Sequence, residues 1–189
     1  PALLIVSGHH AREIVTPVLA LQIMERLLGR YGIDETITRI VDENEIWIAP
    51  VWNPDGYAHV FEADSYWRRN RSSLGFGLHG VDLNRNYPFG WNSPAAGSTD
   101  PTVETFRGRF PASEKETQNM LALAVDRRFA KVLDFHSHGR EVLYTYNDPA
   151  SMPAPVEDWY MAKASELSIR MGYGGRIRKP SAEGEHYQW

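Results

Sequence analysis

Short apolar runs alternate with longer amphipathic segments along this chain. The first run, residues 2–6, is continuous and contains β-branched side chains, which is typical of a strand buried on both faces of a sheet. Apolar residues then recur at helical spacing over residues 18–28, preceded by Thr16 as the expected N-cap and Pro17 as the first helical residue. We therefore expect a strand, a turn at Gly8 and an amphipathic helix at the start of the chain.

The same alternation continues through the rest of the chain. The expected elements are a short helix at 35–41, strands at 45–51, 131–137 and 141–146, and helices at 114–126 and from Pro155 to about Gly172. A capping box, Ser113 to Glu116, marks the start of the helix at 114–126. The last two strands are expected to be neighbours. Strands alternating with helices predict an α/β fold, a three-layer sandwich in which helices flank a twisted, mixed and largely parallel β-sheet.

Two long stretches show neither the apolar runs typical of strands nor the apolar spacing typical of helices. Asn53 to Gly56 reads Asn-Pro-Asp-Gly, a strong turn signal, and residues 57–80 are interpreted as a long functional loop. Residues 88–111 are interpreted as irregular chain because prolines and glycines interrupt them. The length of 189 residues suits one domain with a sizeable core, so we expect residues 1–189 to form a single domain.

Candidate metal ligands lie where two of the expected strands end. His10 and Glu13 follow the first strand at a spacing that lets an imidazole and a carboxylate converge on one cation. His136 follows a later strand, and sites in such sheets lie beyond the carboxyl ends of strands. A zinc ion with a position left for water is our first interpretation. A lone His-x-x-Glu is a weak signal, and His9 is a rival ligand four residues before Glu13.

Five motifs in order make the pattern specific. They are His-Ala-Arg-Glu at 10–13, Asn-Pro-Asp-Gly at 53–56, Trp-Arg-Arg-Asn-Arg at 67–71, Asp-Leu-Asn-Arg-Asn at 82–86 and His-Ser at 136–137. In combination they resemble the zinc metallocarboxypeptidases of the carboxypeptidase A, B and T type. The resemblance implies a carboxypeptidase-like fold and one Zn²⁺ per chain, held by His10, Glu13 and His136. It places the ligand directly before Ala-Arg-Glu, so a structural role, or a role in supporting the ligands, is favoured for His9. It also implies hydrolysis of the C-terminal bond of a peptide or protein substrate that has a free C-terminus.

The resemblance further implies roles for residues that contact the substrate. Arg71 would stabilise the oxyanion of the tetrahedral intermediate, a role typically worth about 3 kcal/mol for one donor. Asn84 and Arg85 would grip the C-terminal carboxylate of the substrate, for which a planar guanidinium is suited. The other residues assigned to the substrate cleft are Arg12, Arg68, His138, Glu185 and Tyr187. His138 is included because it would share a strand face with His136, and an acidic Glu185 would favour substrates that end in lysine or arginine.

The chain also departs from the resembled pattern. The glutamate expected as general base is not found, and none of the candidate substitutes, which are Glu141, Glu183 and Glu185, lies in a matching context. We therefore expect that glutamate beyond Trp189, in a domain truncated at both ends. Pro180 falls where the family carries a mobile tyrosine. Two alternatives stay open: a zinc-binding pseudoenzyme or binding module, and a zinc amidohydrolase that acts on small acyl-amino acids or cell-wall peptides.

Composition narrows the range of partners. The net charge of −4 offers no basic surface for nucleic acid, and no apolar run approaches the length of a transmembrane helix, so we expect neither nucleic acid nor a membrane as partner. Cysteine is absent, which excludes disulfides and thiolate ligands. Secretion to the extracellular space or the periplasm is expected from the resemblance alone, and the oligomeric state is left open.

Overall fold

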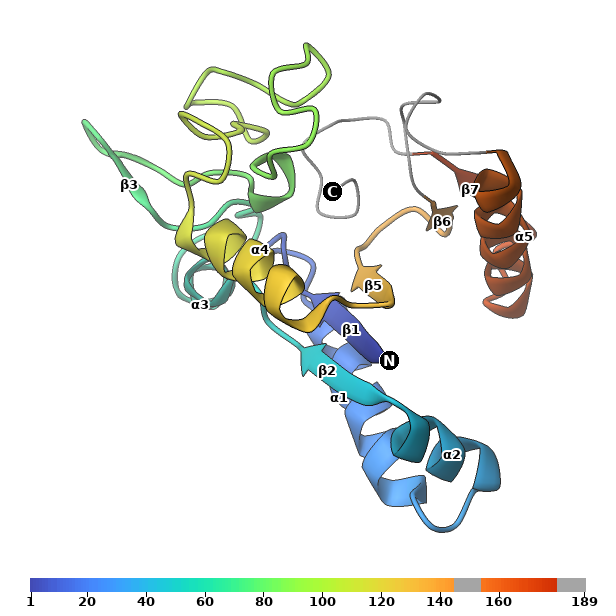
Figure 1. Ribbon diagram of the computed structural model, residues 1–189. Coiled ribbons are helices and arrows are strands. Elements are labelled where there is room, and N and C mark those ends of the chain that lie inside the picture. Colours follow the sequence, from blue (N-terminus) through green and yellow to red (C-terminus); the bar gives the residue numbers. More distant parts are fainter. Residues whose placement is uncertain (145–153, 180–189) are drawn as a thin grey trace.

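A three-stranded parallel sheet forms the centre of the fold (Figure 1). The computed structural model describes residues 1–144 and 154–179. The sheet has the order β2-β1-β5, with β1 at Ala2–Ser7, β2 at Glu45–Ala49 and β5 at Lys131–Phe135. All three strands were expected from their apolar runs, although the second and third end two residues earlier than predicted.

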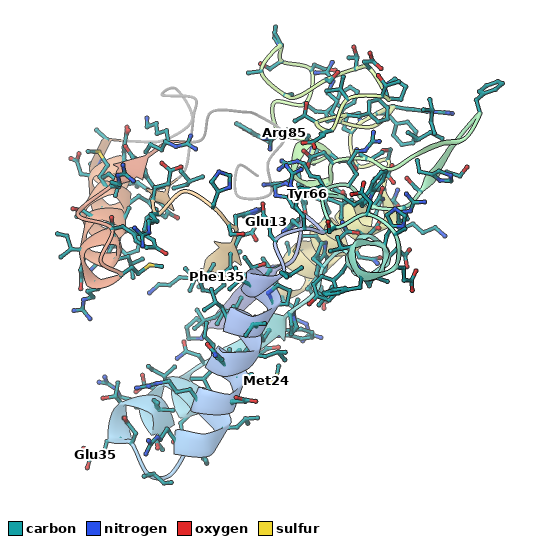
Figure 2. All side chains as sticks on the ribbon, turned by 180° about the vertical axis from the view of Figure 1, so that it is seen from behind. Glu13, Met24, Glu35, Tyr66, Arg85 and Phe135 are labelled. Atoms are coloured by element: carbon teal, nitrogen blue, oxygen red, sulfur yellow. The ribbon has the colours of Figure 1, made fainter. Side chains whose placement is uncertain are left out.

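Helices cover both faces of this sheet. Figures 1 and 2, which view the molecule from opposite sides, place α1 (Val15–Arg30) and α4 (Lys115–Arg127) on opposite faces. The short helix α2 (Glu35–Glu43) packs on α1. Helix, sheet and helix therefore make three layers, which confirms the α/β sandwich predicted from the alternation of strands and helices. Figure 2 shows Glu13 and Phe135 at one end of α1 and Glu35 at the other.

The hydrophobic core lies between the sheet and α4. Leu4 and Val6, alternate residues of β1, point to the same face and contact Met120 of α4 and the buried ring of Tyr87. Partly buried apolar side chains surround this cluster: Trp47, Ala49, Trp52, Leu121 and Phe129. The site described below is built on the edge of this core.

The remaining elements are short or lie beside the sheet. They are α3 (Pro54–Glu62), β3 (Ser73–Gly75), β4 (Leu78–His79), the 3-10 helix η1 (Leu83–Arg85), β6 (Val142–Leu143), α5 (Ala154–Arg170) and β7 (Ile177–Arg178). β3 and β4 form an antiparallel pair, and β6 and β7 form a parallel pair on which α5 packs. Residues 88–111, predicted to be irregular, contain no helix or strand in the structure.

The two predicted helix caps are both wrong. Helix α1 begins after Ile14, and Thr16 lies inside its first turn, where the hydroxyl donates to the Glu13 carbonyl and accepts from the Gly8 amide. The capping box at α4 does not form, because the Ser113 hydroxyl binds the side chain of Glu114. In both cases a tertiary or neighbouring partner competes successfully for the hydroxyl that a helix amide would otherwise use.

Two further expectations on the middle and end of the chain are wrong. The supposed loop at 57–80 contains most of α3 and the β3–β4 pair. Asn53 starts α3 by accepting a hydrogen bond from the Gly56 amide, so Asn-Pro-Asp-Gly is a helix start rather than only a turn. The strand at 142–143 pairs with β7 and not with β5.

Among the described residues, no helix is both long enough and apolar enough to cross a membrane.

Met120 should contribute strongly to stability because it is fully buried between α4 and β1. We expect Met120→Ala to lower the free energy of unfolding by about 2–5 kcal/mol through lost contacts and a residual cavity. Leu28→Ala on α1, where the side chain is 73% exposed, should change it by less than about 0.5 kcal/mol. Urea denaturation of the two variants measures both values, and equal losses would contradict this location of the core.

Candidate metal centre

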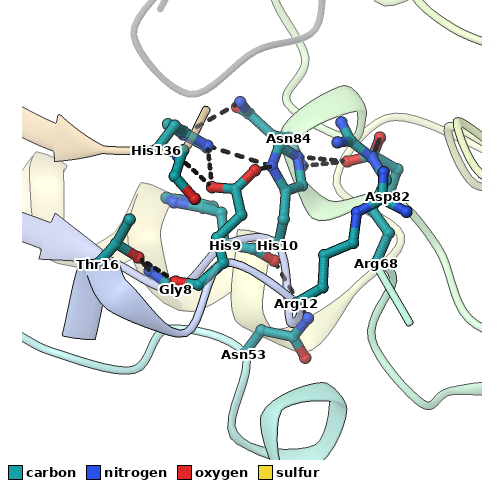
Figure 3. A network of polar contacts seen from close by, with 12 residues as sticks. Gly8, His9, His10, Arg12, Thr16, Asn53, Arg68, Asp82, Asn84 and His136 are labelled. Atoms are coloured by element: carbon teal, nitrogen blue, oxygen red, sulfur yellow. Dashed lines mark hydrogen bonds and ion pairs between the residues drawn. The ribbon is translucent and has the colours of Figure 1, made fainter. Parts of the chain in front are cut away.

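Three side chains converge at the carboxyl ends of β1 and β5. These strands pair in parallel with Ser7 opposite Phe135, so the residues that follow them emerge at the same edge of the sheet. His10 Nδ1 lies 2.8 Å from Glu13 Oε1, and His136 Nδ1 lies 3.1 Å from Glu13 Oε2 and 3.1 Å from His10 Nδ1 (Figure 3). The candidate ligand atoms all lie within 4.8 Å of one another.

A glycine turn delivers the first two ligands. Gly8 has a φ of +71°, a conformation that side chains disfavour, and a Cβ there would lie 3.3 Å from the Pro50 carbonyl oxygen. The close approach to the end of β2 is fixed by hydrogen bonds from the Trp52 amide to the Ser7 carbonyl and from the Asn53 amide to the Gly8 carbonyl. The chain therefore turns sharply after β1 and directs His10 towards β5.

The chemistry and exposure of these groups fit a divalent metal ion. Two ring nitrogens and a carboxylate face one point, so their lone pairs lie close together. A proton or a cation between them relieves the repulsion. The side chains of His10 and Glu13 are 6% and 8% exposed, whereas that of His136 is 24% exposed. The cluster is thus held firmly on the protein side and remains accessible on the His136 side, as a catalytic metal site requires.

Strong local electrostatics accompany the cluster. Burial alone would raise the pKa of Glu13, but hydrogen bonds from His10 and His136 outweigh it and hold that pKa well below its ordinary value. Burial would lower the pKa of His136, but the carboxylates of Asp134 and Glu13 outweigh it and raise that pKa to about 10. The two neighbouring carboxylates therefore favour the protonated, positively charged form of His136.

Asp82 is a part of the site that sequence reasoning missed. His10 Nε2 lies 3.2 Å from Asp82 Oδ1, on the side of the ring opposite to the cluster. The other carboxylate oxygen accepts a 2.9 Å hydrogen bond from Arg68 Nε. Burial alone would raise the pKa of Asp82, but Arg68 and His10 hold it well below its ordinary value. A carboxylate behind a ligating histidine fixes the ring orientation, and the position of Asp82 at the start of Asp-x-Asn-Arg-Asn was the available signal.

Asn84 and Arg85 lie on η1, beside the cluster. Asn84 is buried, and its Nδ2 lies 3.4 Å from His136 Nε2. Arg85 donates a 2.6 Å hydrogen bond to the Asn84 carbonyl. The start of η1 is held because Asp82 accepts from the Asn84 amide. The structure therefore brings the expected carboxylate-binding pair next to the expected metal ligands.

The other arginines assigned to the substrate cleft have partners of their own. Arg12 makes a two-pronged contact with Glu104, at 2.9 and 3.1 Å, which raises its pKa. Arg68 binds Asp82, as described above. The guanidinium of Arg71 stacks on Trp67, 4.6 Å from the ring centroid. None of these three arginines hydrogen-bonds to a ligand side chain within the described part of the chain.

The remaining residues assigned to the cleft are His138, Glu185 and Tyr187, of which only His138 lies within the described structure. His138 is exposed and follows the end of β5, so the expectation that it shares a strand face with His136 is wrong. Glu185 and Tyr187 lie outside the described residues, as does Pro180.

Asn53 connects the metal loop to the arginine loop. Its side-chain amide donates 3.1 Å hydrogen bonds to the His9 carbonyl and to the Arg69 carbonyl, while its oxygen caps α3 (Figure 3). The Ala11 amide adds a bond to the Arg68 carbonyl. One buried side chain thus holds two loops that sequence analysis had treated separately, and Asn-Pro at a helix start was its only signal.

Comparison with known proteins agrees with this geometry. A family model described as zinc carboxypeptidase matches residues 1–187. Metallocarboxypeptidase A of Trichophyton rubrum is 34% identical over 89% of this chain and 40% of its own length. Carboxypeptidase A1 of Rattus norvegicus is 32% identical over 100% of this chain and 45% of its own length. The crystal structure of carboxypeptidase A from Helicoverpa armigera superposes with a TM-score of 0.78 at 30% identity, covering 98% of this chain and 48% of that one. The chain thus spans less than half the length of these relatives.

Metal binding should be linked to the loss of one proton from His136. Because its pKa is raised from 6.5 to about 10, the proton on His136 must leave before Nδ1 can bind a metal ion at neutral pH. We expect the apparent zinc affinity to rise about tenfold from pH 7 to pH 8, measured by competition with a chelator of known pH dependence. The exposed His138→Ala variant should show the same slope. An affinity that does not change between these pH values would refute the linkage.

Proposed function

The chain belongs to the zinc carboxypeptidase family, and on that basis we propose that it forms part of a zinc-dependent hydrolase that removes the C-terminal residue of peptides or proteins. The observation that carries this proposal is the convergence of His10, Glu13 and His136 on one point, with Asn84 beside them. The donors come from two separate strand ends, so their meeting is a property of the fold and not of one local motif.

We assign the bound metal as one Zn²⁺ per chain. Two histidines and one glutamate form a donor set known from catalytic zinc sites, including that of carboxypeptidase A. When bound, zinc supplies Lewis acidity to a carbonyl and lowers the pKa of water. The role of the chain is to hold the three donors in place, with Asp82 against the far side of His10 and with His136 on the accessible side.

Asn84 and Arg85 are our candidates for binding the substrate carboxylate. Asn84 reaches His136, so a group bound by this pair would lie next to the metal ligands. Arginine can meet both oxygens of a carboxylate at once, which favours a chain end over an internal peptide bond. This contact would place the last peptide bond, rather than any other, close to the cluster.

Arg71 is our candidate for stabilising the oxyanion. It belongs to the same loop as Arg68 and Arg69, whose carbonyls are tied to the metal loop by the Ala11 amide and by Asn53. Stacking on Trp67 restrains its guanidinium without neutralising the charge. A positioned cation of this kind can balance the negative charge that develops on the carbonyl oxygen.

No carboxylate in contact with the cluster is assigned as general base. Asp82 is bound by Arg68, and Asp134 is bound by His9 and His136. Glu141, one of the candidates from the sequence, is paired with Arg178 at 2.8 Å. Glu183 and Glu185, the other two candidates from the sequence, lie outside the described residues, so no described carboxylate is assigned this role.

The metal assignment predicts zinc stoichiometry. We expect about one zinc per folded chain, lost in His10→Ala and in His136→Ala because two remaining donors hold zinc poorly. His138→Ala removes an exposed histidine only two residues from His136 and should retain the metal. Elemental analysis after gel filtration, with circular dichroism as the test of folding, measures this. A folded chain that binds no zinc would refute the proposal.

The substrate assignment predicts selectivity for a free C-terminus. A blocked dipeptide with a free carboxylate should bind the zinc-loaded chain at least about tenfold more tightly than its C-terminal amide, because a charged hydrogen bond contributes about 1.5–3 kcal/mol. Arg85→Gln should remove this difference, while Arg30→Gln on the far part of α1 should preserve it. Calorimetry with dipeptides ending in Phe, Leu, Lys and Arg provides the measurement. Acyl-amino acids and cell-wall peptides are added to the panel to test the amidohydrolase alternative. Tighter binding of these compounds than of the dipeptides would favour that alternative.

A further inference from the structure

A line of buried polar side chains runs behind His136, on the side away from the cluster. Tyr87 OH lies 3.0 Å from His9 Nε2, His9 Nδ1 lies 3.2 Å from Asp134 Oδ1, and Asp134 Oδ2 lies 3.0 Å from His136 Nε2. Tyr87 and His9 are completely buried, and the Asp134 side chain is 4% exposed. These residues come from three segments of the chain, so their alignment depends on the whole fold.

The hydrogen positions in this line follow from its chemistry. An ionised carboxylate can only accept, so His9 Nδ1 and His136 Nε2 both donate to Asp134. A neutral His9 must then accept at Nε2, and the hydroxyl of Tyr87 is the donor that lies there. Burial raises the pKa of Tyr87 well above its ordinary value, which keeps that hydrogen in place. Every donor in the line therefore points towards Asp134.

This arrangement selects which nitrogen of His136 is available to a metal ion. With Nε2 donating to Asp134, the lone pair of the neutral ring is at Nδ1, the atom that faces His10 and Glu13. The amide nitrogen of Asn84 also lies near Nε2, but at 3.4 Å, and a contact with a carboxylate at 3.0 Å is the stronger one. Asp134 thus acts on His136 as Asp82 acts on His10.

His9 restrains His136 in a second way. The two rings stack, with centroids 5.8 Å apart and planes 21° from parallel. Rotation of the His136 ring is therefore opposed by packing as well as by its bond to Asp134. His9 in turn is held by the edge of Tyr87, 6.0 Å away between ring centroids.

His9, Asp134 and His136 also form a second group whose atoms lie close enough to hold a metal ion. Both nitrogens of His9 already face hydrogen-bonding partners, and the side chain is inaccessible. An ion at this group would break the bonds from His9 and His136 to Asp134 in a buried place. The geometry therefore favours orientation of His136 by this group over metal binding within it.

We propose that His9 and Asp134, supported by Tyr87, are positioning residues that orient His136 for metal binding, and that His9 is not a ligand. This inference rests on the proposed zinc site at His10, Glu13 and His136. It gives a role to the one histidine of His9-His10 that a ligand motif leaves unexplained.

The test is the zinc affinity of the chain with this line interrupted at three points. The variants are Asp134→Asn, His9→Phe and Tyr87→Phe, and Thr117→Val, which alters a buried hydroxyl on α4, is the control. Zinc affinity is measured at pH 7.5 by competition with a chelator, and urea denaturation of each metal-free chain separates loss of stability from loss of affinity. Asp134→Asn and Tyr87→Phe preserve side-chain shape, so they carry the test if His9→Phe does not fold.

We expect Asp134→Asn to weaken zinc binding by about 100-fold, because its amide can donate to His136 Nε2 and move the ring hydrogen to Nδ1. His9→Phe should weaken it by about 10-fold and Tyr87→Phe by less, with one site retained in each. Thr117→Val should bind as the unaltered chain does. The inference would be overturned if the zinc affinities of Asp134→Asn and His9→Phe lay within twofold of that of the unaltered chain. It would also be overturned if His9→Phe lost zinc binding as completely as His10→Ala. If the unaltered chain binds no zinc, both this inference and the proposed function fail.

Discussion

The register of β1 against β5 is the constraint on which the candidate site depends. Ser7 lies opposite Phe135, so both strands end at the same level and the residues that follow them meet. A shift of one residue would turn every side chain of the strand to the opposite face of the sheet and separate His136 from Glu13. The core beneath supports this register, because Leu4 and Val6 of β1 pack against α4 only in the observed orientation.

Charge balance is the second organising feature of this region. Three buried carboxylates, on Glu13, Asp82 and Asp134, surround the histidines at the sheet edge. Unpaired charges in such a place would be strongly unfavourable. Asp82 is matched by Arg68, and the carboxylates of Asp134 and Glu13 raise the pKa of His136, which favours its positively charged form. A divalent ion at the cluster would supply positive charge in the same place.

Sequence patterns predicted the parts of the structure that depend on local order. Continuous apolar runs identified β1 and β5, and the order of the motifs identified His10, Glu13 and His136 as a set. The contacts that were missed are those in which a side chain serves a distant partner. Thr16 binds the loop before its own helix, and Asn53 joins two loops. The positions of Thr16 and Asn53 in the sequence do not indicate these distant partners. Asp82 opens a motif that is visible in the sequence, but its contact with His10, like that of Asp134 with His136, could not be predicted from spacing.

The separation of the ligands along the chain has a consequence for the order of folding. His10 and His136 are 126 positions apart, and they meet only after β5 has paired with β1. Contacts of such long range form slowly, because the chain between them loses conformational entropy before the contacts can stabilise the fold. Binding of a metal ion by all three side chains would therefore follow the pairing of β5 with β1 and could not initiate it. A nascent chain that has not yet reached residue 136 presents only the His10 and Glu13 half of the site, so all three side chains become available to a metal ion only after β5 has been synthesised.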